Sequence, residues 1–460
     1  MNKALFSEFD AVSSKQWKQK IQFDLKGADY NDTLIWQTNE GIPVKPFYHA
    51  DDFKDLQNVS NTKATQWKIC QSIFVADVEK SNLKALDVIQ RGAESIQFIL
   101  PSEDISIENL LKNIDLDSTA LYFELQFLSE AFVKKLSAIP KNPANYGEGI
   151  HIQTDIIGNL AKTGNWLNNL NDDFKKFEAI IKRTSQLSVD VSLYQNAGAT
   201  MVQQLAYALA HANEYLNYTN SDSYQEKQSF NINFKISVGT NYFFEIAKLR
   251  ALRELWHTLA LEYKTNTNCY ILATPTKRNK TLYDYNTNML RTTTECMSAI
   301  LGGANTICNL PFDAIYHKNN EFGERIARNQ LLVLKQESYF DKVNNPSDGS
   351  YYIESLTNQL AEKALDLFKN IEANGGFLKQ LKEGTIQRKI KESATKEQQQ
   401  FDSGEDILLG TNKHPNVNDK MKNELELYPF VKTNQRKTLI EPIIEKRLAE
   451  QLEQKRLKIE

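Results

Sequence analysis

The feature of this sequence that most constrains its fold is a short apolar run followed by a helical pattern, repeated about eight times after residue 65. Runs that are continuously apolar indicate strands buried on both faces, and helices between them indicate a parallel sheet with helical cover. About eight such units fit a closed (β/α)8 TIM barrel better than an open sheet, although spacing alone also permits a doubly wound fold. The strand candidates are KICQSIFVA, SIQFIL, LYFELQF, GIHIQTD, LSVDVSLY, FNINFKISVG, NCYILATP and NTICNLPFD.

Residues 241–263 carry the clearest helical pattern, with an apolar stripe at spacings of three and four residues. The stripe consists of Phe244, Ala247, Ala251, Leu255 and Leu259. Glu245 in this helix, and Glu295 in a later one, stand near Lys248 and Arg291, which predicts an ion pair along each helix.

The two ends of the chain differ from the repeated pattern. Residues 1–60 predict an N-terminal arm, in which Ser13–Ser14 caps a short helix and two extended pieces then flank Asn39–Gly41. Residues 61–400 predict the barrel. Residues 401–460 predict a C-terminal helical tail, with one continuous helix from 439 onward. The expected fold is therefore an α/β barrel with an extended arm and a helical tail.

Composition limits the classes of function. Apolar residues make up 41% of the chain and charged residues 25%, which permits a large core, and the formal net charge of −3 argues against nucleic acid as a partner. No apolar run has the length of a membrane span, and the first twenty residues do not form a signal peptide. Four cysteines without a C-x-x-C motif predict buried, reduced thiols. We therefore expect a cytoplasmic protein without a membrane partner.

The stretch 188–210 poses a question about chemistry. It predicts a strand that reaches a small-residue turn, Ala197–Gly198–Ala199, and then a helix, as at the mouth of an α/β barrel where catalytic residues stand. Between Asp190 and His211, however, the only titratable side chains are the phenols of Tyr194 and Tyr207. The sequence predicts an active-site mouth without an acid or a base.

Other parts of the chain supply few candidate catalytic or metal-binding residues. There is no G-x-G-x-x-G, P-loop or H-E-x-x-H motif, and no two of the six histidines stand at ligand spacing, which predicts no metal site. Asp155 and Asp313 follow predicted strands, where they could be catalytic, but helix capping is the stronger interpretation. His211 and His257 fall inside helices and are interpreted as structural.

Several stretches together resemble the methylmalonyl-CoA mutase family. They are WQTNEGIPVKPFY, YQNAGATMVQQLAYALAHANEYL, ISVGTNYFFEIAKLRALRELW, NMLRTTTECMSAILGGAN and RIARNQLLVLKQESYFDKVNNPSDGSYYIESLT, and the likeness runs from about residue 4 to residue 450. The resemblance implies a TIM barrel whose axis is threaded by acyl-CoA. It also implies adenosylcobalamin, held by a separate flavodoxin-like domain over the mouth, for a radical interconversion of methylmalonyl-CoA and succinyl-CoA.

The sequence departs from the catalytic members of that family. Their cobalamin domain carries an Asp-x-His-x-x-Gly motif and would follow the last helix, but no histidine of this chain has an aspartate two residues before it. When their Tyr-His-Met-Gln-Glu-Ala-Gly-Ala motif is aligned with this sequence, its tyrosine falls on Ser192 and its thioester-binding histidine falls on Leu193. Their substrate-carboxylate arginine falls on Thr163, the tyrosine of Arg-Gln-Tyr-Ala-Gly on Ser72, and a His-x-Gln pair on Leu272 and Thr274.

The resemblance therefore implies a small, non-catalytic subunit with no catalytic, cofactor-binding or metal-binding residues of its own. It would stabilise a homologous large subunit in a heterodimer, its arm wrapping that partner, and adenosylcobalamin would lie in the partner. Two alternatives stay open. The barrel could be an active acyl-CoA mutase that uses a cobalamin domain from a separate chain, or the chain could be a free-standing CoA-ester binding protein.

Overall fold

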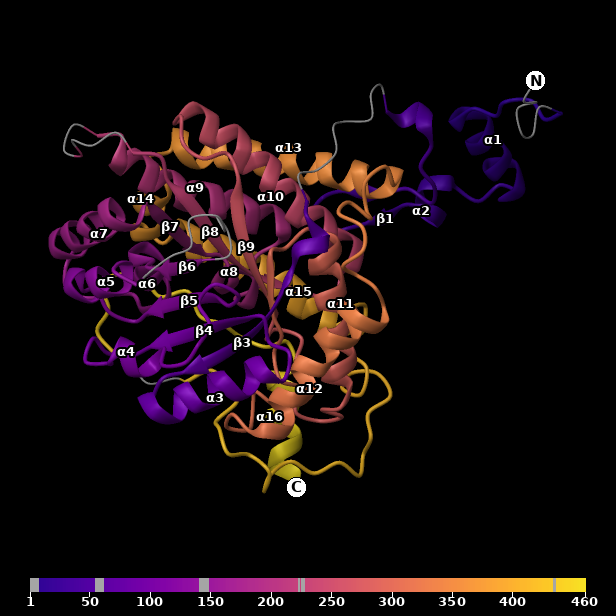
Figure 1. Cartoon of the computed structure of the whole chain (residues 1–460). Helices are drawn as coiled ribbons and strands as arrows, with labels where there is room; N and C mark the ends of the chain where they lie inside the picture. Colours follow the sequence, from indigo (N-terminus) through magenta and orange to yellow (C-terminus); the bar gives the residue numbers. More distant parts are fainter. Residues whose placement is uncertain (1–7, 54–61, 140–148, 222–223, 225–227, 433–435) are drawn as a thin grey trace.

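A computed structural model describes residues 8–53, 62–139, 149–221, 224, 228–432 and 436–460. Eight parallel strands surround a common axis in the spatial order β6-β5-β4-β3-β10-β9-β8-β7, with helices outside them (Figure 1). This arrangement confirms the expected TIM barrel and all eight strand candidates. The strands are β3 (Lys68–Phe74), β4 (Ser95–Leu100), β5 (Ala120–Leu125), β6 (Ile150–Gln153), β7 (Gln186–Asp190), β8 (Asn231–Val238), β9 (Cys269–Pro275) and β10 (Thr306–Cys308).

The barrel closes between β6 and β7 through side chains. The Gln186 amide accepts from the Ile152 amide nitrogen at 2.8 Å and donates to the Ile150 carbonyl at 2.9 Å. Two residues further along β7, the Ser188 hydroxyl donates to the Thr154 carbonyl at 2.8 Å. These bonds join the two strands at the edges that the backbone ladder leaves unpaired, so the sheet is a nearly closed ring.

Helices α3 to α12 follow the barrel strands, and α13 lies across α9 and α10 (Figure 1). The long helix α10 confirms the predicted stripe, because four of its five members are buried. The helices are α1 (Ser14–Asp24), α2 (Tyr30–Leu34), α3 (Val78–Gln90), α4 (Ile107–Leu110), α5 (Glu130–Ser137), α6 (Ile156–Thr163), α7 (Leu170–Thr184), α8 (Ser192–Asn196), α9 (Met201–Thr219), α10 (Tyr242–Glu262), α11 (Thr287–Leu301), α12 (Glu321–Leu332), α13 (Tyr351–Ala373), α14 (Phe377–Lys382), α15 (Thr385–Ser403) and α16 (Glu450–Ile459).

The two faces of each strand differ. Alternate residues such as Ile96, Phe98, Phe123 and Phe234 are fully buried against the helices in the main core. The other set faces the barrel axis, where Cys70, Tyr122 and Leu272 form a separate cluster with Ala120 and Cys308. The axis of the barrel is therefore filled by side chains rather than left as a channel.

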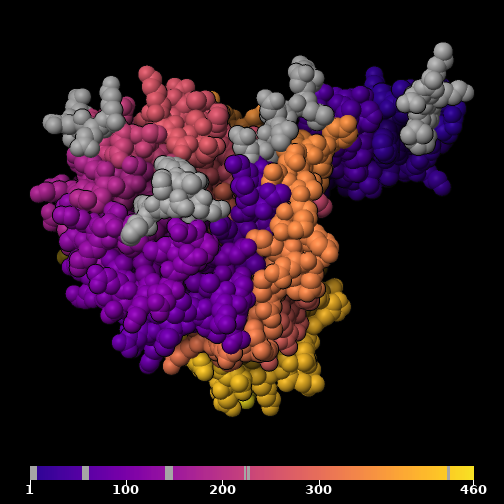
Figure 2. Space-filling model, viewed as in Figure 1, coloured from indigo at the N-terminus to yellow at the C-terminus, as the bar shows by residue number. Residues whose placement is uncertain are grey.

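Helix α1 of the N-terminal arm stands away from the barrel, whereas the hairpin of the arm contacts α9 and α10 (Figure 1). Helix α1 begins with a capping box at Ser13, as expected, and contains no buried residue. Two short strands, β1 (Trp36–Gln37) and β2 (Pro43–Val44), then form a hairpin around Asn39–Gly41, which confirms the two extended pieces. The arm forms a lobe beside the barrel in Figure 2. The first seven residues of the expected arm and residues 54–61 at its end lie outside the described residues.

Three local predictions were wrong. The run LSVDVSLY is a strand only to Asp190, after which residues 192–196 form the short helix α8. The predicted continuous helix from residue 439 begins only at Glu450. Glu295 pairs with Lys280 at 2.8 Å rather than with Arg291, whereas Glu245 and Lys248 form the expected pair at 2.6 Å.

Candidate functional site at the barrel mouth

Three rings meet inside the barrel. Tyr122 on β5 stacks on His151 on β6 with ring centroids 4.6 Å apart, and His151 lies 4.5 Å from the ring of Tyr270 on β9. The Tyr122 hydroxyl is also 2.7 Å from the hydroxyl of Thr306 on β10, on the far side of the axis. We call Tyr122, His151 and Tyr270 the ring plug. It spans the barrel from β5 to β9 and β10.

A charged layer lies between the ring plug and the mouth. The Lys235 ammonium on β8 is 2.8 Å from the Glu124 carboxylate and 3.5 Å from that of Asp190. Burial lowers the pKa of Lys235, but the charges of Asp190 and Glu124 outweigh it and leave the pKa above its ordinary value. Gln97 donates to Glu124 at 3.0 Å. Lys235 therefore stays protonated and paired, a state in which its amine is not a nucleophile.

The six positions singled out from the sequence lie on the axis-facing side of the strands and on the elements that follow them. Ser72 is on β3, Leu272 and Thr274 are on β9, and Leu272 belongs to the buried cluster inside the barrel. The other three follow strands: Ser192 and Leu193 are in α8, and Thr163 ends α6.

The polar groups of Ser192 and Thr163 are hydrogen-bonded within the protein, and Leu193 is buried. Ser192 donates its backbone N–H to Asp190 at 3.0 Å and its hydroxyl to the same carboxylate. Leu193 is 4% exposed and packs in the main core. Thr163 donates to the Asn159 carbonyl at 2.8 Å.

Tyr194 belongs to a buried chain of hydrogen bonds that the sequence did not reveal. Its hydroxyl is 2.9 Å from His211 Nδ1, and His211 Nε2 is 2.9 Å from Asp155 Oδ1. The Tyr215 hydroxyl donates to the same oxygen at 2.6 Å. Asp155 also accepts from the Gly158 N–H at 2.8 Å and so caps α6. The capping interpretation of Asp155 is confirmed, and His211 makes the buried polar contacts that its structural interpretation expects.

Asp155→Asn should destabilise the fold by about 2 kcal/mol at neutral pH, because hydrogen bonds to a charged acceptor are lost in a buried site. Burial raises the pKa of Asp155, but His211, the Asp190 N–H and Tyr215 outweigh it and leave the pKa below its ordinary value. The carboxylate therefore contributes stability above the unfolded pKa of about 3.9, and that contribution is lost as the pH falls through the lower folded pKa.

Denaturant titration of the wild type and Asp155→Asn at several pH values measures this effect. The difference between the two should shrink as the pH falls below about 4. Asp87→Asn is the control, because its pair with Arg91 is half exposed and contributes at most about 1 kcal/mol. A difference that stays constant down to pH 2 would contradict the assignment.

The C-terminal segment 439–448 runs along the rim of the barrel mouth. The Leu439 and Ile440 N–H groups donate to the Gly164 carbonyl after α6, at 2.9 and 3.1 Å. The Lys446 N–H donates to Asn196 O at 3.1 Å, and the Leu448 N–H donates to Arg278 O at 2.9 Å. The loops that follow β6, β7 and β9 are therefore joined by one extended strap, which we call the rim strap.

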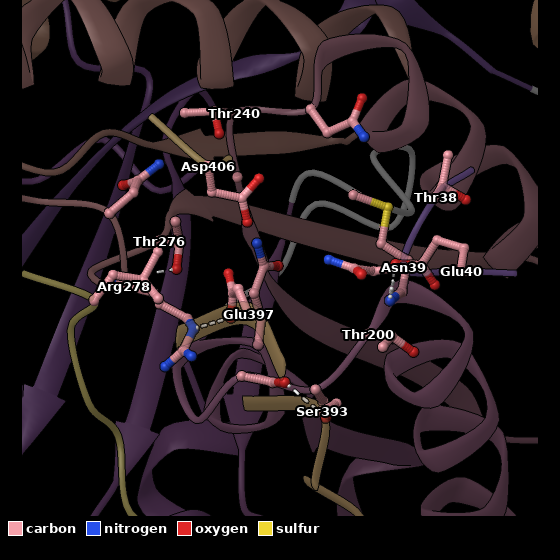
Figure 3. A pocket seen from close by; sticks show the side chains of 18 of the residues that line it. Thr38, Asn39, Glu40, Thr200, Thr240, Thr276, Arg278, Ser393, Glu397 and Asp406 are labelled. Carbon is pink, nitrogen blue, oxygen red and sulfur yellow. Dashed lines mark hydrogen bonds and ion pairs between the residues drawn. The ribbon is translucent and has the colours of Figure 1, made fainter. Parts of the chain in front are cut away.

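A cavity of about 270 Å³ lies beside the mouth (Figure 3). Its walls come from the arm hairpin, the N-terminus of α9, the loops after β8 and β9, and α15. Arg278 donates to Glu397 across it at 2.6 Å. The polar residues that line it include Thr38, Asn39, Glu40, Gln195, Thr200, Gln204, Thr240, Asn241, Glu245, Thr276, Arg278, Asn279, Ser393, Glu397 and Asp406.

The chemistry available in this cavity is limited. The Glu40 carboxylate accepts from the Met201 and Val202 N–H groups, both at 2.8 Å, and so caps α9 from the arm. Burial raises the pKa of Glu40 despite these two bonds. The described lining contains no histidine, cysteine or lysine, and its hydroxyl, amide and carboxylate groups offer hydrogen bonds to a small polar molecule. Among the described residues, no group of three or more potential ligands could hold a metal ion, and no helix could span a membrane.

The sequence of this chain is similar to proteins of one family. The family model described as methylmalonyl-CoA mutase matches residues 102–458. A methylmalonyl-CoA mutase small subunit from Porphyromonas gingivalis is 36% identical over 92% of this chain and 73% of its own length. The methylmalonyl-CoA mutase of Cereibacter sphaeroides is 31% identical over 86% of this chain, and the human mitochondrial mutase 29% identical over 87%.

This chain spans only part of the longer relatives, namely 64% of the Cereibacter sphaeroides mutase and 60% of the human enzyme. The match to the family model covers most of the barrel and continues through α15 to α16, and the similarity to the small subunit extends over nearly the whole chain. Together with the barrel fold, these matches show that the chain belongs to the methylmalonyl-CoA mutase family.

Proposed function

We propose that this chain is the small subunit of a heterodimeric, adenosylcobalamin-dependent methylmalonyl-CoA mutase. In this proposal the homologous large subunit interconverts methylmalonyl-CoA and succinyl-CoA, and the small subunit stabilises it without catalysing the reaction. The complex is an isomerase in the cytoplasm, and residues 1–60, 61–400 and 401–460 serve as arm, barrel and tail. The observation that carries the proposal is the ring plug, supported by the similarity to a small subunit.

The ring plug bears on substrate access. An acyl-CoA that threads the barrel needs an open axis, but Tyr122 and Tyr270 meet His151 there, and Tyr122 reaches Thr306 opposite. Tyr122 has no exposed surface, and Leu272 beside it is 2% exposed. Moving rings out of a close-packed core would cost several kcal/mol, which a substrate would have to supply on binding. This supports a barrel that no CoA ester enters.

The replaced positions support the same conclusion from the chemistry. Leucine at 193 cannot donate a hydrogen bond to a thioester oxygen, and threonine at 163 cannot form a bidentate pair with a substrate carboxylate. Each pre-organised donor of this kind typically contributes about a hundredfold in rate. The remaining charged layer of Glu124, Asp190 and Lys235 is internally paired.

The residues at the mouth do not fit a cobalamin. The rim strap is bonded to the end of α6 and to the segments that follow β7 and β9, on the side of the barrel over which the family's cofactor would lie. His151 and His211 are buried in contacts with Tyr122 and Asp155 and cannot reach a metal above the mouth. We therefore place adenosylcobalamin in the partner subunit and derive no step through it in this chain.

The purified chain should bind no adenosylcobalamin at micromolar protein, because His151 and His211 are buried and no histidine of the chain follows an aspartate by two positions, as the family's cobalt ligand does. Titration followed by visible absorbance measures this, since ligation of cobalt by a histidine changes the spectrum. A stoichiometric spectral shift would contradict the proposal and would favour an active barrel.

The N-terminal arm supports a protein partner. Helix α1 buries none of its residues in this chain, and Phe9 and Phe23 are 71% and 78% exposed. Trp17 is held by stacking on Phe47 at 4.8 Å but remains 47% exposed. Exposed aromatic side chains on a segment that projects from the body are typical of an interface that another chain covers (Figures 1 and 2).

Affinity capture of the tagged chain from its native extract, followed by mass spectrometry, tests the proposed function. We expect a mutase large subunit in a one-to-one ratio. Calorimetry with methylmalonyl-CoA separates the alternatives: binding by the isolated chain without a partner would favour a free-standing CoA-ester binding protein. Capture of a small cobalamin protein in place of a large subunit would favour an active barrel.

A further inference from the structure

Two of the four cysteines face each other across neighbouring strands. The strand register pairs Cys308 on β10 directly with Cys70 on β3, and all four cysteines are free thiols. Neighbouring strands lie about 4.8 Å apart, and paired residues point to the same face of a sheet. A disulfide requires a Cα separation of roughly 4.4–6.8 Å. The backbone therefore already holds these two residues at a distance that a disulfide can bridge.

The surroundings of the pair shift the pKa values of its two thiols in opposite directions. Both side chains belong to the buried cluster inside the barrel with Tyr122 and Leu272. The hydrogen bond from Cys70 lowers the pKa of Cys308, and the charge of Lys235 adds to this effect against the opposing effect of burial. Burial, together with the same hydrogen bond, holds the pKa of Cys70 well above its ordinary value. Cys308 is thus the more readily ionised of the two thiols.

The other two cysteines lack these features and serve as internal controls. Cys269 is on β9 beside the Arg253 guanidinium, with sulfur and nitrogen 3.9 Å apart, and burial raises its pKa. Cys296 is on α11, donates to the Asn309 side chain at 3.4 Å, and burial holds its pKa well above the ordinary value.

We propose that Cys70 and Cys308 form an oxidation-sensitive dithiol, which a peroxide converts to a disulfide between the first and last strands of the barrel. The Cys308 thiolate attacks one peroxide oxygen, the O–O bond breaks, and the released hydroxide takes up a proton to leave as water. The Cys70 sulfur then attacks the resulting sulfenic acid, the S–O bond breaks, and a second water leaves with the Cys70 proton. The two thiols lose two electrons and the peroxide gains them.

The position of the pair gives the disulfide a mechanical consequence. The ladder between β3 and β10 joins the first barrel strand in the chain to the last. It has three residue pairs, whereas the ladder between β3 and β4 has five. A covalent bond at its end joins strands that are far apart in sequence, and closing a long loop restricts the unfolded chain most. The oxidised chain should therefore resist unfolding more than the reduced chain.

The test treats the folded, full-length chain with a small excess of hydrogen peroxide, followed by alkylation and intact mass spectrometry. We expect a loss of about 2 Da, a fall from four free thiols to two after denaturation, and a disulfide-linked peptide that contains Cys70 and Cys308. Cys70→Ser and Cys308→Ser should each abolish the linkage, and Cys269→Ser and Cys296→Ser should retain it.

Thermal unfolding supplies a second readout. The oxidised wild type should unfold at a higher temperature than the reduced wild type, dithiothreitol should reverse the shift, and Cys70→Ser should show none. Recovery of four free thiols after treatment of the folded chain, or a linkage that persists in Cys70→Ser, would overturn the proposal. A linkage without any shift in the unfolding temperature would overturn its mechanical consequence.

Discussion

A chain that begins at Asp29, and so lacks α1, is expected to bind the large subunit about a hundredfold more weakly than the full chain. Phe9 and Phe23 expose most of their surface and are the aromatic anchors that a partner would bury. Loss of two such anchors at roughly 1.4 kcal/mol each gives this factor. The truncation leaves Asp29 to cap α2 and Glu40 to cap α9, and so the barrel should stay folded.

Size-exclusion chromatography and calorimetry of the mixed subunits measure this loss. Phe23→Ala should weaken binding about tenfold by itself. Ile459→Ala at the other end of the chain, 86% exposed, is the matched control and should have no effect. If the truncated chain pairs as tightly as the full one, α1 is not part of the interface.

Lys248→Met is expected to destabilise the isolated chain by about 3–5 kcal/mol, because it leaves the buried Glu245 carboxylate without its charge partner. The Lys248 ammonium is 2.6 Å from Glu245 and donates to Gln195, Gln204 and the Ser237 carbonyl at 2.9–3.0 Å. These contacts join α10 to the helix and strand ends at the mouth. The measurement is the free energy of unfolding from urea titration.

Two further variants separate the charge from the packing. The double variant Lys248→Met with Glu245→Leu should recover much of the loss, since replacing both charges by apolar groups is often near neutral. Lys389→Met is the control, because its pair with Glu392 is half exposed and contributes at most about 1 kcal/mol. A loss under 1 kcal/mol for Lys248→Met would contradict the importance of the buried pair.

The barrel could be predicted from the sequence because continuously apolar strands give a clear signal. The helix α8 could not, since the alternation in LSVDVSLY continues past Asp190. Contacts from distant elements decide its structure: Tyr194 packs on Tyr207 and Phe377 and bonds His211. Tertiary packing of this kind overrides local preference.

The rim strap shows a similar limit. Residues 439–449 have helical spacing, but Pro442 interrupts a helix, and the Leu439, Ile440 and Ile443 N–H groups bond carbonyls at the end of α6 instead. The pairing of Glu295 with Lys280 likewise depends on a turn that brings the loop after β9 back onto α11.

The candidate site was predictable only in part. Family motifs located Ser72, Thr163, Ser192, Leu193, Leu272 and Thr274, and the structure places three of them on axis-facing strand positions and three on the helices that follow strands. The sequence did not predict the ring plug. The contacts among Tyr122, His151 and Tyr270 depend on strand register and barrel closure.

The most direct test of the central claim is the turnover of methylmalonyl-CoA by reconstituted heterodimers at saturating adenosylcobalamin. Leu193→Ala in this chain should leave kcat nearly unchanged, with its cost appearing as lower stability from a smaller core side chain. Replacing the histidine in the large subunit's Tyr-His-Met-Gln-Glu-Ala-Gly-Ala motif should lower kcat about a hundredfold. A hundredfold drop in kcat from Leu193→Ala in an intact complex would mean that this barrel takes part in the chemistry.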